Sequence, residues 1–299
     1  MNSLYLIFEY PADNLLLFGQ HEPWLVVLSV LVAMVSAILA LHTVTQSHYV
    51  VSSTRRRMIL LAGSMALGGG VWSMHFIGML AFDLCTPVNY ATGLTLLSML
   101  PSVVASWVAL SISSRPEFNL RELLAGGVLM GAGIGTMHYT GMAAMVMAPA
   151  LRYDLTFFML SILVAVGLSM LALWIRFGIR NLGISKMTSM QLNIISGAVM
   201  GIAISGMHYT GMAAARFVPP VGLELLDATP QSTVMAIGVA VTTVTITCLV
   251  VAVDMVLRYR DLSLSLQAKE TRLRAILDTA VDGIIIINTK GVIVAANQA

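Results

Sequence analysis

The chain has 299 residues, of which 58% are hydrophobic and only 10% are charged, with a formal net charge of +2 at pH 7. A soluble protein carries about 25% charged residues, so this composition excludes that class and indicates an integral membrane protein. The basic residues follow the predicted topology described below, so we expect no nucleic-acid partner.

Residues 1–23 contain no Lys or Arg, so they lack the basic beginning of a signal peptide. We expect an extracytoplasmic segment that leads into an uncleaved first helix. Seven apolar segments follow, each long enough for the roughly 20 residues that span a bilayer. They cover residues 24–41, 58–80, 92–112, 123–147, 156–175, 191–214 and 233–257. The sequence therefore predicts an all-α membrane protein with seven transmembrane helices in a domain over residues 24–257.

The basic residues fall almost entirely on one side of these segments. Alternate loops and the tail after the seventh segment hold 14 of the 16 Lys and Arg residues, and only Arg152 and Arg216 fall on the other side. Cytoplasmic loops carry an excess of Lys and Arg. We therefore predict that the N-terminus lies outside and the C-terminus in the cytoplasm.

One six-residue phrase occurs three times, toward the outer ends of the second, fourth and sixth segments. The copies read MHFIGM at residues 74–79, MHYTGM at 137–142 and MHYTGM at 207–212. Positions i and i+4 lie on one helix face, so each copy presents a His and its second Met together. These pairs are His75 with Met79, His138 with Met142, and His208 with Met212. The predicted topology places all three pairs at one depth, toward the extracytoplasmic side.

A stripe of small residues continues each phrase along its helix. Gly68, Gly131 and Gly201 each stand seven residues before a His, close to it on the helical wheel. Small residues at such spacing let membrane helices approach closely. We interpret the stripe as the surface on which the three phrase-bearing helices pack together.

Imidazole and thioether groups together suit copper, especially Cu(I), better than magnesium, calcium or manganese. Three histidines would supply a trigonal nitrogen set, with methionine sulfurs as weak axial ligands. The leading residues Met74, Met137 and Met207 point about 100° away from their histidines and are secondary candidates. Zinc accepts three histidines but gains little from methionine. Haem needs only two facing histidines, so three copies favour copper over haem.

Other functions fit the pattern less well. A copper or proton transporter should carry polar or ionisable groups along a path through the membrane, whereas Gly, Ser, Val and Ile lie below the phrases. A haem-binding membrane redox protein would need a cofactor site and substrate groups that the sequence does not suggest. No nucleophile, carboxylate pair or phosphate loop is evident, so we expect that this chain itself is not an enzyme.

The C-terminal region differs from the apolar segments. Residues 258–277 read as an amphipathic connector helix, and residues 278–299 contain two β-rich runs around a turn at Lys290 and Gly291. A hairpin alone is not a stable domain, so we expect the chain to be part of a longer protein.

The three phrases resemble those of the MHYT family of bacterial integral-membrane sensors, named for the sequence Met-His-Tyr-Thr. The resemblance covers residues 24–257, although Phe76 and Ile77 replace Tyr and Thr in the first copy. It implies a copper-binding sensor of the bacterial inner membrane, whose metal ligands are the His and Met residues of the three pairs. The expected signal is a diatomic gas (oxygen, carbon monoxide or nitric oxide) or redox state.

The same resemblance implies partners beyond the lipid bilayer. Family members carry a cytoplasmic output domain in the same chain, commonly a histidine kinase or an enzyme that makes or breaks cyclic di-GMP. Residues 278–299 look like the start of a PAS domain, an α/β fold that is incomplete here. A homodimer would be compatible with the connector helix.

Overall fold

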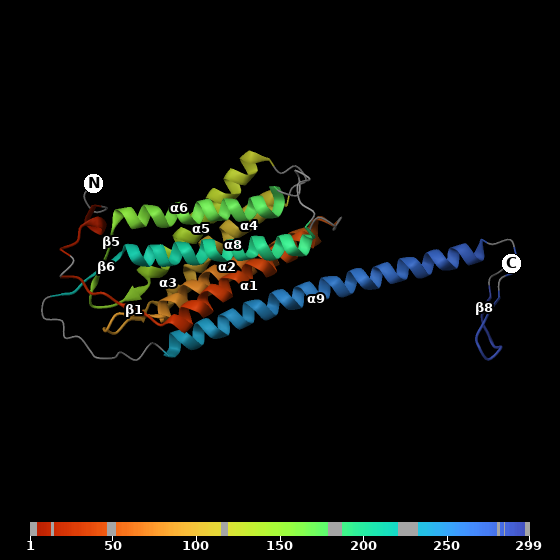
Figure 1. The fold of residues 1–299 in the computed structure, drawn as a ribbon. Coiled ribbons are helices and arrows are strands. Elements are labelled where there is room, and N and C mark those ends of the chain that lie inside the picture. Colours follow the sequence, from red (N-terminus) through yellow and green to blue (C-terminus); the bar gives the residue numbers. More distant parts are fainter. Residues whose placement is uncertain are drawn as a thin grey trace. The chain divides into compact units, whose positions relative to one another are not determined.

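A computed structural model describes residues 5–12, 15–46, 52–114, 119–178, 187–220, 233–279, 282–283 and 285–296. The chain forms two compact units, Met1–Val250 and Val251–Ala299. The first unit is a bundle of long helices that lie side by side (Figure 1). Its helices are α1 (Pro23–Gln46), α2 (Ser53–Leu80), α3 (Thr92–Leu97), α4 (Met99–Ser113), α5 (Leu120–Ala143), α6 (Leu155–Leu173), α8 (Ser189–Ala214) and the beginning of α9 (Thr233–Asp278).

Six helices of the described part of the chain are long and apolar enough to cross a membrane. These spans are Pro23–Thr45, Ser53–Leu80, Thr92–Ile112, Leu155–Arg176, Ser189–Ala214 and Met235–Val253. They coincide with six of the seven predicted segments. The remaining segment forms α5, which is 24 residues long but contains six glycines, so its composition is less apolar. The count of seven spans and their orientation stay predictions.

Six long helices form a closed ring in which each packs on the next. The order is α1, α2, α4, α5, α6 and α8, and α8 packs on α1 again. The phrase-bearing helices α2, α5 and α8 therefore alternate with α4, α6 and α1. This order gives the ring an approximate threefold symmetry, with α2 paired to α4, α5 to α6, and α8 to α1.

The small-residue stripe has other packing partners than we interpreted from the sequence. Each glycine of the stripe lies so close to the backbone of a neighbouring helix that a Cβ atom would overlap it. The pairs are Gly68 with Val103 of α4, Gly131 with Val166 of α6, and Gly201 with Met34 of α1. The glycines thus allow each phrase-bearing helix to pack closely against its neighbour in the ring. The interpretation that the stripes join the three phrase-bearing helices to one another is wrong.

Serines repeat the same register in α1, in α6 and at the junction of α3 and α4. Ser98, Ser161 and Ser29 stand five residues before Val103, Val166 and Met34, and each donates a hydrogen bond to the carbonyl three residues earlier. Tyr139 of α5 is hydrogen bonded to Ser161 at 2.8 Å, and Tyr209 of α8 to Ser29 at 2.7 Å. Phe76 of α2 follows its His as these tyrosines do, but it has no hydroxyl for Ser98. The equal register shows that α1 fills the third place, equivalent to α4 and α6.

Short antiparallel strand pairs tie the ends of the phrase-bearing helices to the ring. The strand after each of these helices pairs with a strand that precedes a neighbouring helix. The pairs are β2 (Phe82–Asp83) with β1 (Gln20–His21), β4 (Met145–Val146) with β3 (Asn89–Tyr90), and β6 (Ala215–Val218) with β5 (Ala150–Tyr153). The helix ends that carry the phrases are therefore held together by backbone hydrogen bonds.

Asp154 connects three parts of this end of the bundle. It caps α6 by accepting a hydrogen bond from the Phe157 N–H at 3.0 Å, and it accepts another from the Tyr10 hydroxyl at 2.8 Å. The Arg216 guanidinium lies 3.7 Å away. The backbone bond from Phe157, the Tyr10 hydroxyl and the charge of Arg216 lower the pKa of Asp154.

We expect Asp154→Ala to lower the free energy of unfolding by about 1 kcal/mol at neutral pH, the usual worth of a helix cap. Because the folded state lowers this pKa, the ionic part of the stabilisation is present above the ordinary carboxyl pKa and is lost as the pH falls through the lowered value. Thermal unfolding at neutral and strongly acidic pH measures both effects. Asp154→Asn, which keeps the cap without the charge, should fall between wild type and the Ala variant; a pH-independent gap between wild type and Asp154→Asn would contradict the ionic contribution.

The second unit contains the remainder of α9 and a two-stranded antiparallel hairpin. Strand β7 (Ile285–Ile287) pairs with β8 (Ile293–Ala296), with an irregular register between Ile286 and Ile287. Gly291, with φ of 77°, lies in the connecting turn, where a backbone of this kind favours glycine. Residues 258–277 are helical, as predicted. The hairpin agrees with the predicted β-rich runs, and its assignment to a PAS domain stays a prediction.

Candidate metal centre

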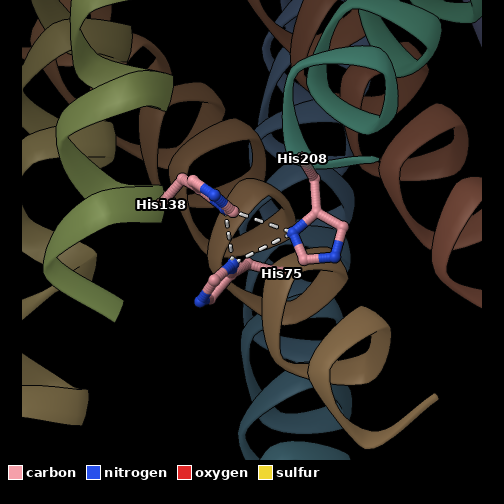
Figure 2. A group of neighbouring side chains, drawn as sticks. All are labelled: His75, His138 and His208. Carbon is pink, nitrogen blue, oxygen red and sulfur yellow. Dashed lines mark hydrogen bonds between the residues drawn. The ribbon is translucent and has the colours of Figure 1, made fainter. Parts of the chain in front are cut away.

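Three histidines, one from each phrase, meet in the middle of the ring (Figure 2). The Nδ1 atom of His75 lies 3.1 Å from Nδ1 of His138 and 3.1 Å from Nδ1 of His208. The Nδ1 atoms of His138 and His208 are 3.3 Å apart. All three side chains are buried, with at most 1% of each residue exposed. The prediction that the repeated phrases bring their histidines together is confirmed.

The close approach of three Nδ1 atoms needs a chemical explanation. A nitrogen of neutral imidazole either donates a proton or accepts one, and it does not do both. Any assignment of protons to three neutral rings therefore leaves two nitrogens of the same kind facing each other at hydrogen-bond distance. A metal ion that accepts three lone pairs would remove this conflict. The triangle is also of suitable size, because its centre is about 1.8 Å from each nitrogen and metal–nitrogen bonds of about 2.0–2.1 Å are usual.

The far side of each imidazole rests on the glycine of another phrase. A Cβ atom on any of these glycines would overlap the Nε2 edge of the ring. The pairs follow the ring in one direction, with His75 on Gly141, His138 on Gly211 and His208 on Gly78. In this buried setting the three Nε2 atoms have no hydrogen-bond partner among the described residues. The Nδ1 side of each ring is therefore the side that faces a common point.

These glycines are site residues that the sequence reasoning missed. Each stands three residues after a His in all three phrases, so the signal was visible in the repeat. The predicted role of glycine concerns only the packing stripe below the phrases. The structure shows that the glycine within the phrase makes room for a histidine from a different helix.

The methionines of the phrases lie in two apolar clusters. Met79, Met142 and Met212 share one cluster with Leu84 and Phe217. Met74, Met137 and Met207 belong to the main core of the bundle. All six are buried. Each histidine thus stands between buried methionines of its own phrase, and direct ligation by the methionine sulfurs stays a prediction.

Aromatic side chains complete the walls of the site. Phe76, Tyr139 and Tyr209 each stand edge-on to the preceding histidine, with ring centroids 4.7–4.8 Å apart. The two tyrosine hydroxyls point to serines of α6 and α1 rather than to the triad. All three rings therefore support the imidazoles, and the two tyrosines also link them to the neighbouring helices.

Comparison with known proteins places these features in a family. A family model described as MHYT, bacterial signalling protein N terminal repeat, matches residues 68–126, 131–186 and 201–263. Each match contains one phrase and the helix that follows it in sequence. No solved structure matches the chain.

Several curated bacterial proteins are similar to the chain. It is 50% identical over 158 residues to the bifunctional diguanylate cyclase/cyclic di-GMP phosphodiesterase MucR of Pseudomonas aeruginosa. This match covers 53% of this chain and 23% of the relative. It is 30% identical over 289 residues to the signaling protein YkoW of Bacillus subtilis, a match that covers 93% of this chain and 35% of the relative. It is 35% identical over 218 residues to the cyclic di-GMP phosphodiesterase NbdA of P. aeruginosa, a match that covers 73% of this chain and 27% of the relative. The matched regions thus span 23–35% of the relatives' lengths.

In the third repeat, the helix that follows the phrase packs in a different place than in the other two repeats. Its match includes α9, which follows α8 in sequence as α4 follows α2 and α6 follows α5. In the structure, however, α1 takes the ring position beside α8. Helix α9 instead contacts α2, where the Thr243 hydroxyl donates to the Ser73 hydroxyl at 2.7 Å and Ile246 lies against Gly69. The helix that continues into the second unit therefore touches α2 only two residues before His75.

Proposed function

Because the chain belongs to the MHYT family of bacterial signalling proteins, we propose that it is a copper-binding sensor module embedded in the bacterial inner membrane. The observation that carries this proposal is the convergence of three buried imidazole nitrogens from three equivalent helices. Soft thioethers in the same phrases favour copper, especially Cu(I), over zinc. His75, His138 and His208 would hold the ion, and the thioethers of Met79, Met142 and Met212 would be the candidates for additional, weaker ligands.

The proposed metal centre lies toward the extracytoplasmic side of the membrane, as the distribution of basic residues predicts. A bound copper ion would supply redox activity and a coordination position for a diatomic gas such as oxygen, carbon monoxide or nitric oxide. The protein contributes the rest of the site. The glycines of the phrases hold the imidazoles in place, and the apolar clusters around the methionines exclude water.

The residues below the triad favour a sensor over a transporter. Val71, Ile134 and Ile204 stand four residues before the three histidines, and at most 1% of each is exposed. They form an apolar layer one helical turn from the site. A path for copper or protons would need polar groups at this depth. The layer therefore supports the proposal that the chain detects a ligand and does not transport one.

The proposed signal leaves the site through α2 and α9. Ser73 stands two residues before His75 and is hydrogen bonded to Thr243 of α9. A change at the metal that shifts α2 would change this contact, and α9 continues toward the C-terminus. We propose a cytoplasmic output domain in the same chain, and the names of two relatives support cyclic di-GMP turnover as its activity.

The metal content of the purified protein tests this function. We expect about one copper ion per chain, because the three histidines form one trigonal set. His138→Ala should lose most of the copper, whereas His42→Gln, a histidine of α1 outside the triad, should keep it. Elemental analysis after dialysis measures both variants. Absence of metal in the wild-type protein, or zinc held equally by wild type and His138→Ala, would overturn the copper proposal, and a haem absorption band would favour the redox alternative.

A further inference from the structure

A cavity of about 360 Å³ lies within the first unit between α2, α3 and the beginning of α9. Trp72 and Tyr90 form aromatic walls, Thr95 and Leu96 come from α3, and Gly238 and Val239 come from α9. Among the residues that the structure describes, none of the side chains that line it is charged. The volume and the mixture of apolar walls with a few polar groups are typical of small-molecule sites.

Thr95 and Tyr90 are two of the polar residues that line the cavity, beside Asn89, Thr92 and Thr242. Thr95 is 6% exposed, and its Oγ1 atom is buried without a hydrogen-bond partner in the described part of the chain. Such a group costs stability unless a partner reaches it. Tyr90, whose pKa is raised by burial, remains a neutral hydroxyl. Each of these hydroxyls carries a proton that it can donate to an acceptor.

The walls of the cavity are held in a fixed arrangement. The indole Nε1–H of Trp72 donates to the Thr95 carbonyl at 2.8 Å. The ring of Trp72 packs on Phe76 with centroids 5.0 Å apart, and Phe76 packs on Tyr90 at 5.9 Å. The two aromatic walls therefore belong to one rigid group. This group continues to His75, whose ring centroid is 4.7 Å from that of Phe76.

We propose that this cavity binds a neutral, planar, membrane-soluble molecule whose ring carries carbonyl oxygens, the chemistry of a quinone. The aromatic walls favour a flat ring, and the hydroxyls of Thr95 and Tyr90 match carbonyl acceptors. The described lining residues carry no charge, which disfavours ionic ligands, including charged lipid headgroups, because a buried charge needs a partner. Binding of the quinone requires no metal, so the proposal stands apart from the copper centre.

A ligand in this position would touch both α2 and α9. Val239 and Thr242 line the cavity from α9, and the next residue, Thr243, is hydrogen bonded to Ser73 of α2. Occupation of the cavity would therefore change how α9 rests on α2, close to the first phrase. The site gives the sensor a second input, independent of the metal, on the helix that leads to the second unit.

Titration of the full chain in nanodiscs with a short-chain ubiquinone tests this proposal, with tryptophan fluorescence as the signal. We expect saturable quenching that is lost in Trp72→Phe, which removes the reporter on the cavity wall. Gly238→Leu should abolish saturable binding, because a Cβ atom at Gly238 meets nothing within 4 Å and the longer side chain fills the cavity. Gly167→Leu on α6, where a Cβ atom also meets nothing within 4 Å, is the matched control and should bind normally.

Thr95→Val tests the chemical class of the ligand. It preserves the shape of the side chain and removes the unpaired hydroxyl, so quinone affinity should fall roughly threefold to tenfold, the loss of one hydrogen bond. Linear quenching that does not saturate, or equal binding by Gly238→Leu and Gly167→Leu, would overturn the site. Unchanged affinity in Thr95→Val, or competition by decanol as strong as by a quinone, would show a groove for acyl chains and overturn the proposed class.

Discussion

Replacing Gly141 by alanine is expected to remove most of the bound metal and to destabilise the protein. In an ordinary helix position the same change would stabilise the folded state by about 1 kcal/mol, because alanine is the better helix former. Here the new methyl group would overlap the Nε2 edge of His75. The imidazole would have to tilt, and its Nδ1 atom would leave the point that it shares with His138 and His208. We expect metal affinity to fall at least about tenfold, a cost of 1.4 kcal/mol or more.

Gly167→Ala provides the matched control for this result. Gly167 also lies inside a helix, but a Cβ atom there meets nothing within 4 Å. This variant should keep its metal and melt at the same or a higher temperature. Metal analysis and thermal unfolding of both variants measure the two expected differences, in metal content and in stability. Normal metal content in Gly141→Ala would mean that the phrase glycine does not position the histidine.

Replacing Asn193 by leucine is expected to cause the largest loss of stability. Arg176 is buried at 1% exposure, and its guanidinium donates to Asn193 Oδ1 and, at 2.6 Å, to Thr45 Oγ1. This cluster joins α1, α8 and the turn Trp174–Gly178 after α6. Loss of the amide would leave donors of a buried charge without their acceptor. Removal of one partner of a buried charge typically costs about 3–5 kcal/mol, and the lower end is expected because Thr45 still accepts.

Asn193→Asp separates the polar contact from the shape of the side chain. A carboxylate keeps the acceptor and adds an opposite charge, so this variant should be clearly more stable than Asn193→Leu. Thermal unfolding in detergent, with the unfolded fraction followed by circular dichroism, measures the difference. Equal stability of the two variants would show that the buried guanidinium does not depend on Asn193.

Arg176 lies in a helical turn and not in the loop that the sequence predicts. Its charge and its place beyond an apolar segment assigned it to a cytoplasmic loop. In the structure the helix continues through a π-helical turn, and the side chain points into the ring. Sequence position gave no sign of this, because Asn193 and Thr45, its partners, are 17 and 131 residues away.

Most of the long helices and the meeting of the three histidines could be predicted from the sequence. Apolar length and low charge predicted the membrane helices, since a lipid environment requires such segments. The helical period placed His75, His138 and His208 on equivalent faces at one depth, and the structure brings them together. Local composition was less informative for α5, whose six glycines serve close packing and make the segment less apolar.

Which helix surfaces contact one another depends on tertiary packing. A stripe of glycines shows that another backbone approaches closely, but not which one, and Gly68, Gly131 and Gly201 proved to contact α4, α6 and α1. The position of α1 in the third pair, in place of α9, could not be read from the repeat, because α9 is the helix that continues the repeat in sequence. The seating of each imidazole on the glycine of another phrase likewise depends on contacts between residues more than 60 positions apart. Such contacts are set by the packing of whole helices, which no local pattern specifies.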